Sequence, residues 1–101
     1  MIIYEVRIHL DPSIAAAYRS WLDQHVHQIL SIPGFNCAEL LQEESDAGAP
    51  VLVVRYHLDS RQALSTYLRD LAPSLRADGT ARFGDRFKAT RRVLELVRVF
   101  P

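Results

Sequence analysis

One short phrase occurs twice in the chain. Val6-Arg7-Ile8-His9-Leu10-Asp11 returns as Val54-Arg55-Tyr56-His57-Leu58-Asp59, with tyrosine in place of isoleucine as the one change. Each copy has the alternation of a strand, stops at an aspartate and is followed by a stretch with helical spacing. A half-repeat of this kind predicts a β-α-β-β-α-β sandwich whose two halves are related by pseudo-symmetry.

The repeated segments lie in two strands that each have one buried face. Residues 2–10 and 51–58 alternate between apolar side chains and a second, more polar set. We expect the apolar set to face the helices; it comprises Tyr4, Val6, Ile8, Val54, Tyr56 and Leu58. The opposite face, which we call the open face, then carries Glu5, Arg7, His9, Arg55 and His57.

The first half of the chain supplies a helix and a second strand. Asp11 and Pro12 are typical of a helix start, and the break at residues 31–34 ends that helix. A strand is expected from residue 35 to about residue 43, although its pattern leaves its facing open. Residues 44–50 have the composition of a hairpin loop.

The second half repeats this order. Asp59 is expected to cap the next helix, which restarts at Pro73 as a separate segment and ends at Gly84. Residues 91–100 are rich in β-branched side chains and are expected to form the last strand.

This order of elements predicts a four-stranded antiparallel sheet with both helices on one face. Its first and third strands are expected to be adjacent and parallel at the centre. The last strand adds four side chains to the open face if Leu94 and Leu96 point to the helices. These four are Arg91, Val93, Glu95 and Val97.

The open face is too apolar to be an idle solvated surface, because it also carries Val51 and Val53. We therefore expect a homodimer in which two open faces meet and seal a partly polar cavity. The alternative is a monomer with a polar surface sheet.

The chain resembles a known group in several places: the opening Met1-Ile2-Ile3-Tyr4-Glu5-Val6, the pattern Trp21-Leu22-x-x-His25, and the stretch from Ala72-Pro73-Ser74-Leu75 through Arg82-Phe83-Gly84-Asp85-Arg86-Phe87. Together they resemble a bacterial family of unknown function within the dimeric α+β-barrel (ferredoxin-like) group. The resemblance covers nearly the whole chain and implies a ferredoxin-like α+β fold and a dimer. The wider group includes cofactor-independent monooxygenases, haem-degrading enzymes, dehalogenase-like proteins and plain ligand binders, so the fold alone does not select an activity.

Composition narrows the class of protein. A chain of 101 residues with 49% hydrophobic residues fits a single domain over residues 1–101 with a small core. Its 12 basic and 12 acidic residues cancel, and arginine and histidine replace the stacking aromatics of an RNA-binding sheet, so we expect no nucleic-acid partner. The start lacks signal-peptide features and no run is long enough to span a bilayer, so a cytoplasmic protein with no membrane partner is expected. Cys37 is the single cysteine and is expected to be a buried small hydrophobe.

The open face supplies most of the candidate functional residues. Arg7 and Arg55 are suited to holding an organic anion, with Glu5 and Glu95 beside them. His9 and His57 are candidate acid–base residues that could share a proton, a water or a metal if the two strands run side by side in parallel. In the alternative interpretation, the arginines form structural ion pairs with Glu5, Glu95 or the acids of a partner subunit.

One further candidate lies on the first helix. His25 shares its apolar stripe with Trp21, so it is either a core histidine bonded to a carbonyl or a buried general base at a cavity edge. No spacing supplies a third metal ligand, and we expect neither a metal nor another cofactor. Two hypotheses remain: a dimeric barrel that binds a small anionic organic ligand, with monooxygenase-like chemistry as a possibility, or a non-enzymatic interaction homodimer whose polar face is only its interface.

Overall fold

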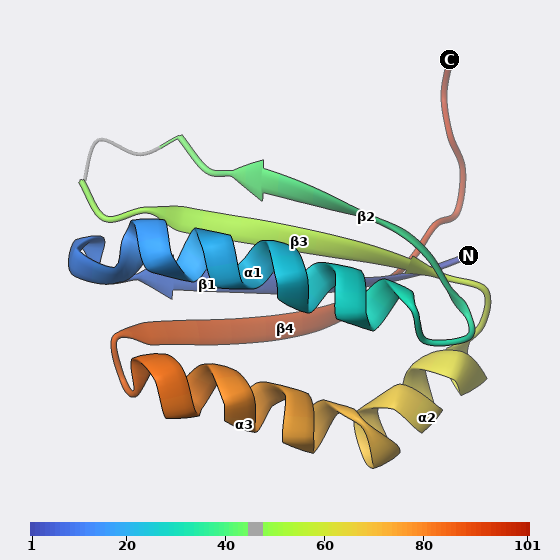
Figure 1. Ribbon diagram of the computed structural model, residues 1–101. Coiled ribbons are helices and arrows are strands. Elements are labelled where there is room, and N and C mark those ends of the chain that lie inside the picture. Colours follow the sequence, from blue (N-terminus) through green and yellow to red (C-terminus); the bar gives the residue numbers. More distant parts are fainter. Residues whose placement is uncertain (45–47) are drawn as a thin grey trace.

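The computed structural model describes residues 1–44 and 48–101, and it has the predicted β-α-β-β-α-β order (Figure 1). The strands are β1 (Ile2–Leu10), β2 (Phe35–Gln42), β3 (Val51–Leu58) and β4 (Phe87–Glu95). The helices are η1 (Pro12–Ile14), α1 (Ala15–Leu30), α2 (Arg61–Asp70) and α3 (Ala72–Phe83). The predicted hairpin loop between β2 and β3 lies partly outside the described residues. Among those described, no helix has the length and apolar character needed to cross a membrane.

The four strands form one sheet in the order β2-β3-β1-β4, with every neighbouring pair antiparallel. The helices pack on one side of this sheet, and no described helix covers the opposite side (Figure 1). All six side chains predicted to face the helices belong to the core or pack against it. The antiparallel ferredoxin-like sandwich predicted from the half-repeat is therefore confirmed.

The prediction that β1 and β3 run parallel is wrong. The β1-α1-β2 crossover makes β2 parallel to β1, and the hairpin then turns β3 back between them, so β3 opposes both. The register pairs His9 with Val51 and His57 with Ile3. The two histidines consequently lie at opposite ends of the central strand pair, roughly 20 Å apart at about 3.4 Å per residue. They cannot share a proton, a water or a metal within one chain.

The last strand also differs from its prediction. It begins at Phe87, because α3 ends at Phe83 and Gly84 (φ 59°) turns the chain directly into the sheet, and it ends at Glu95. Arg92 pairs with Glu5 on the open face, whereas Arg91 pairs with Val6 on the helix side. The expected facing is thus reversed, because β4 has apolar side chains on both faces and its alternation does not decide between them.

Local capping explains the remaining boundaries. Asp11 accepts a hydrogen bond from the backbone N–H of Ser13 and starts η1 as predicted. Ser60 caps α2, not Asp59, because the Ser60 hydroxyl accepts from the N–H of Ala63 at 3.2 Å. The break between α2 and α3 falls at Leu71, and Pro73 lies in the first turn of α3 as expected.

The structure shows which face of the sheet each side chain of β2 occupies, a point that the sequence left open. Leu41 pairs with Val53 on the open face, whereas Leu40 pairs with Val54 on the helix side. Cys37 is exposed, so the expectation of a buried thiol is wrong. It pairs with His57 on the open face, which no helix covers.

Candidate functional site

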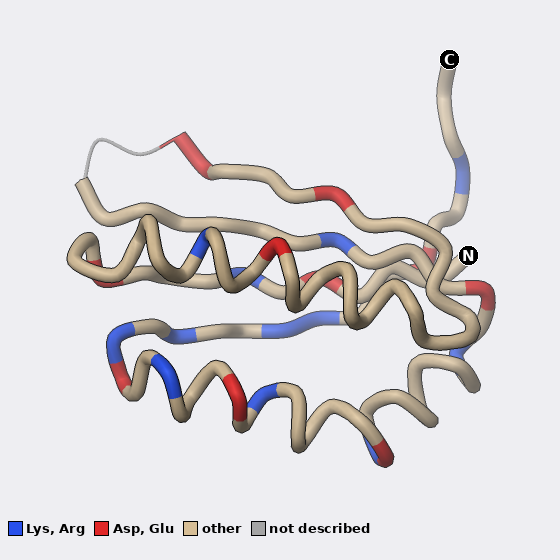
Figure 2. Tube along the Cα trace, in the orientation of Figure 1, with Lys and Arg blue, Asp and Glu red and all other residues tan. Residues whose placement is uncertain are grey.

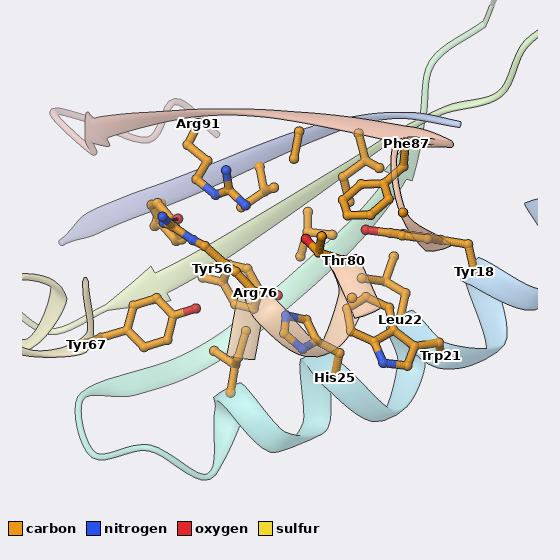
Figure 3. Close-up of a pocket in the computed structure, with 18 residues that line it drawn as sticks. Tyr18, Trp21, Leu22, His25, Tyr56, Tyr67, Arg76, Thr80, Phe87 and Arg91 are labelled. Atoms are coloured by element: carbon orange, nitrogen blue, oxygen red, sulfur yellow. Dashed lines mark hydrogen bonds between the residues drawn. The ribbon is translucent and has the colours of Figure 1, made fainter. Parts of the chain in front are cut away.

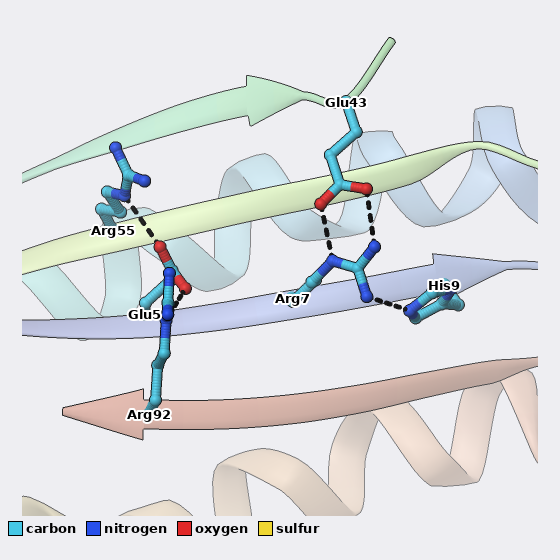
Figure 4. A network of polar contacts seen from close by, with 6 residues as sticks. All are labelled: Glu5, Arg7, His9, Glu43, Arg55 and Arg92. Carbon is cyan, nitrogen blue, oxygen red and sulfur yellow. Dashed lines mark hydrogen bonds and ion pairs between the residues drawn. The ribbon is translucent and has the colours of Figure 1, made fainter. Parts of the chain in front are cut away.

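Two polar regions lie on opposite faces of the sheet. The first is the open face, where Arg7 donates from Nε to Glu43 Oε1 at 2.6 Å and from Nη2 to Glu43 Oε2 at 2.7 Å (Figure 4). Its third nitrogen, Nη1, lies 2.9 Å from His9 Nε2, and this imidazole nitrogen accepts the bond because a guanidinium has only donors. Arg7 is therefore engaged on both sides by its own chain.

Glu5 is the centre of a second cluster on the same face. Its side chain is buried, with the residue only 5% exposed, and it accepts bonds from Arg55 at 2.9 Å and from Arg92 (Figure 4). The hydrogen bond from Arg92 is the main reason why the pKa of Glu5 lies below its ordinary value; the bond from Arg55 adds to this, and burial opposes it. This cluster has the character of a structural ion-pair network.

The structure separates the remaining predicted site residues. His57 donates from Nε2 to Glu39 at 2.7 Å near the β2 edge. Glu95 lies on the helix side, where its carboxylate is 3.6 Å from Arg61. Glu39 and Glu43, the partners of His57 and Arg7, were missed because the facing of β2 could not be read from its sequence. A broad open-face depression of about 570 Å³ has Arg7, Arg55 and Arg92 in its lining, with Glu5 and Glu43, and Arg91 of β4 also borders it.

The second polar region is a cavity of about 310 Å³ between the sheet, α1 and α3 (Figure 3). We call it the helix-side cavity. Its larger aromatic and polar lining residues are Tyr4, Tyr18, Trp21, His25, Tyr56, Tyr67, Arg76, Thr80, Phe87 and Arg91. Of the site residues predicted from sequence, only His25 is found here.

Aromatic rings form the walls of this cavity. Tyr4 stacks with Tyr56 at a centroid distance of 6.0 Å, and Tyr67 meets Tyr4 edge-on at 6.1 Å. On the opposite wall the ring of His25 stacks on Trp21 at 4.5 Å with an interplanar angle of 20°. The Trp21 indole donates from Nε1 to Asp78 at 3.0 Å, which holds the ring in place beneath His25. These rings present apolar faces suited to a flat ligand.

His25 is the one histidine in this cavity. Burial lowers its pKa from the ordinary value of 6.5, and the charge of Asp78 only partly offsets that effect. The imidazole is therefore neutral at pH 7 and able to accept a proton. The sequence left two interpretations of His25 open. The structure does not show the hydrogen bond to a carbonyl that a core histidine would make, since among the described residues His25 has no hydrogen-bond partner, and its ring lines the cavity.

The tyrosines of the cavity act as donors rather than bases. Burial raises the pKa of Tyr18 and of Tyr67 to about 12 and raises that of Tyr56 further. Their phenols therefore keep their protons at neutral pH and can donate hydrogen bonds to a ligand.

Two arginines supply the positive charge of the cavity. Arg76 of α3 donates from Nη2 to the Tyr4 hydroxyl at 2.9 Å. Arg91 extends from β4 into the cavity, as Figure 3 shows, and Figure 2 shows basic positions on β4 separated by uncharged ones. The cavity lining, as far as the structure describes the chain, contains no aspartate or glutamate. The sequence pattern predicts Arg91 on the open face, because the alternation of β4 does not decide which of its faces points to the helices.

No metal-binding arrangement is found in the described ranges 1–44 and 48–101, where no group of three His, Cys, Asp or Glu side chains converges. The helix-side cavity instead offers a neutral base, several phenol donors, two guanidiniums and flat apolar walls. This combination can bind an organic molecule and take a proton from it.

The fold and this cavity define the chain as a ferredoxin-like α+β domain of the kind found in dimeric α+β barrels. It belongs to the family described as Domain of unknown function (DUF4286), which matches residues 1–97. No curated protein has a matching sequence.

Solved structures show the same fold at low sequence identity. A dimeric ferredoxin-like protein from an uncultured marine organism has a TM-score of 0.80 and 8% identity, with 98% of this chain and 97% of that chain covered. An antibiotic biosynthesis monooxygenase has a TM-score of 0.73 and 15% identity, covering 97% and 100%. SnoaB, a cofactor-independent oxygenase from Streptomyces nogalater, has a TM-score of 0.72 and 17% identity, covering 99% and 96%. At these identities the likeness establishes the fold alone.

Proposed function

We propose that the helix-side cavity binds a small, planar organic molecule as an anion, and that His25 takes a proton from it in cofactor-independent, monooxygenase-like chemistry. The observation that carries this proposal is the composition of one cavity: a neutral imidazole, flat aromatic walls and two arginines without a lining acid. The likeness to a cofactor-independent oxygenase supports the choice of chemistry.

The cavity has a suitable size. Its volume of about 310 Å³ is at the lower end of the range for small-molecule sites, roughly 300–1,000 Å³. A ligand of two or three fused rings would occupy it with its faces against the tyrosines and its edge toward His25. The aromatic contacts would supply most of the binding free energy, and the charged groups would orient the ligand.

An oxygenase without a cofactor requires a substrate that can itself pass electrons to oxygen. A methylene group flanked by aromatic rings and conjugated to a ketone meets this need, because its anion is delocalised. His25 would remove one C–H proton, and a guanidinium would stabilise the enolate. The enolate then reduces O₂ and combines with it to give a peroxide at the same carbon. His25 returns the proton to the peroxide and then removes the second proton of the same carbon as the O–O bond breaks. The hydroxide that leaves takes up this second proton to give water, so that CH₂ and O₂ become C=O and H₂O.

The experiment is an oxygen-uptake assay with anthrone carboxylate, whose ring methylene has these properties and whose quinone product is read by absorbance. The wild-type protein should accelerate uptake over the uncatalysed rate, and His25→Gln should lose about a hundredfold of that acceleration. The matched control is His27→Gln, since His27 is exposed on the same helix and contacts the backbone oxygen of Asp23. Full activity in folded His25→Gln, or no acceleration by the wild-type protein, would overturn the proposal.

A second role is favoured for the open face, namely contact with a second copy of the chain. Leu41 faces this side and is 39% exposed, whereas Val51 and Val53 beside it are already buried within the chain. β4 is followed by an exposed apolar tail, with Val97 89% and Phe100 75% exposed. Exposed apolar side chains of this kind are typical of an interaction site. In this interpretation the open-face side chains order the interface through their ion pairs and hydrogen bonds rather than bind a ligand; these are Arg7, His9, Arg55 and His57.

The oligomeric state tests this second role. Light scattering after size exclusion should give about twice the chain mass of 11.5 kDa. Truncation after Glu95, which removes the exposed tail, should shift the population toward monomer. A monomeric wild-type protein at micromolar concentration would rule out the homodimer.

A further inference from the structure

Arg91 and Arg92 are consecutive residues of β4 with opposite surroundings. Arg92 points to the open face and binds the carboxylate of Glu5. Arg91 points to the helix side and, within the part of the chain that the structure describes, has neither an ion-pair partner nor a side-chain hydrogen bond. A guanidinium presents five N–H donors in a planar fork, so Arg91 offers a complete and unused set of donors to the cavity.

The charge of Arg91 acts on groups on every wall of the helix-side cavity. It opposes the rise in the pKa of Tyr18, Tyr56 and Tyr67 that burial causes, and it adds to the lowering of the pKa of His25 by burial. Figure 3 shows the Arg91 guanidinium directed into the helix-side cavity, and Arg91 is one of the residues that line it. Arg91 is exposed, so its donors are accessible to a ligand that occupies the cavity.

Arg76 contributes a second guanidinium. Its bond to the Tyr4 hydroxyl uses one donor and anchors the side chain against the sheet, so the remaining donors are held in position. Its charge also acts on the Tyr67 hydroxyl, as does that of Arg91, which places both cations around one wall.

The nearby acids are committed elsewhere. Asp78 accepts from Trp21 at 3.0 Å and from Arg82 at 3.4 Å, and Glu95 faces Arg61. The two cavity arginines thus carry positive charge that nothing in the described lining neutralises. An anion that binds there is attracted by both, and a carboxylate matches the guanidinium fork with two parallel hydrogen bonds.

We infer that Arg91, assisted by Arg76, recognises a carboxylate on the ligand, and that the natural ligands are aromatic carboxylates. The inference rests on the proposed function of the helix-side cavity and adds the substrate class. Because Arg91 comes from the sheet and His25 from α1, the carboxylate is anchored at the sheet and the reacting edge of the ring faces His25. Arg91 is in this account a specificity-determining residue.

The test uses 2-naphthoate and 2-naphthamide, which have the same shape and differ in charge. Isothermal titration calorimetry on the intact chain should show 2-naphthoate binding at least tenfold more tightly than the amide. Arg91→Gln should remove this preference while leaving the weaker affinity for the amide. Arg92→Gln is the matched control, because its side chain points to the open face, and it should keep the preference. Arg76→Gln should reduce the preference in part.

The outcomes separate the two proposals. Equal affinity of the wild-type protein for both compounds would overturn the carboxylate inference and leave the cavity as a binding site for neutral rings. A preference that survives in both Arg91→Gln and Arg76→Gln would also overturn it. Failure of both compounds to bind would count against the proposed function as well. The wild-type comparison needs no variant, so it decides the matter even if Arg91→Gln does not fold.

Discussion

The two faces of the sheet contain the same residue types and put them to different uses. On the open face, Arg7, Arg55 and Arg92 each have a carboxylate of the same chain within hydrogen-bond distance. On the helix side, Arg91 has none among the described residues. A cluster of arginine and histidine therefore indicates a binding site or a structural network only when the carboxylates around it are known. Where the acids are present the cluster is a structural network, and where they are absent it is a candidate anion site.

The activity of the helix-side cavity should depend most strongly on pH. His25 must be neutral to accept a proton, and burial keeps its pKa below 6.5. We expect kcat/KM to be flat above pH 6.5 and to fall about tenfold per pH unit below the lowered pKa. The measurement is the oxygen-uptake rate from pH 4.5 to 8, in steps of about half a unit. An acid limb centred above pH 6.5 would contradict the assignment of His25.

The next effect is a loss of stability on the open face. Glu5→Gln leaves Arg55 and Arg92 without their carboxylate, so the free energy of unfolding should fall by about 1–3 kcal/mol in urea titrations. Because the pKa of Glu5 is lowered in the folded state, its contribution is present above the ordinary value of 4.5 and is lost as pH falls through the lowered value. The wild-type protein should therefore lose this stability at acid pH, whereas the variant should lack that part of the pH dependence.

Glu5→Gln also distinguishes the two faces of the sheet, because it should leave the affinity for 2-naphthoate unchanged within about twofold. A large loss of affinity in folded Glu5→Gln would mean that the open face contributes to ligand binding.

A smaller effect is expected from narrowing the helix-side cavity. A Cβ at Gly79 of α3 would come within 2.9 Å of Trp21 Cη2, so the indole must shift toward the cavity or its neighbours. Gly79→Ala should weaken the binding of 2-naphthoate several-fold and leave the dimer unaffected. Calorimetry and light scattering on the same sample would check both expectations. Unchanged affinity would show that the ligand does not lie against Trp21.

The smallest effect concerns the stability of Arg91→Gln. Since Arg91 has no partner in the described residues, its loss should change the free energy of unfolding by no more than about 0.5 kcal/mol. Arg92→Gln, which removes a partner of the buried Glu5, should be the less stable of the two variants in the same urea titration. The reverse order would show that Arg91 has a structural role.

The fold could be predicted because the repeated phrase carries its own alternation and stop signals. The helix-facing set and the break before Pro73 follow from local patterns of this kind, and the central placement of the first and third strands follows from the order of the elements. The direction of β3 relative to β1 did not, because a repeat in sequence gives no strand direction; only the crossover and the hairpin determine it. The facing of β4 was also predicted wrongly, since both of its faces carry apolar side chains and its alternation is ambiguous.

The candidate site was predicted in part. His25 was found because a histidine on an apolar helical stripe beside Trp21 is unusual enough to mark a buried position. The sequence places Arg91 on the wrong face, because the alternation of β4 is ambiguous. It does not indicate Arg76, because α3 has no strong amphipathic pattern that shows which side chains reach the cavity. The available signal was the pair Arg91-Arg92, since two consecutive arginines in a strand must point to opposite faces.

In the proposed mode of binding, the ligand lies in the helix-side cavity and not at the open face. The most direct test is an NMR titration with 2-naphthoate that follows the Nε–Hε signals of the arginine side chains, each assigned by its substitution with glutamine. The account predicts that the Arg91 signal shifts most, followed by Arg76, while those of Arg7 and Arg55 stay in place. Shifts confined to Arg7 and Arg55 would place the ligand on the open face and contradict the account.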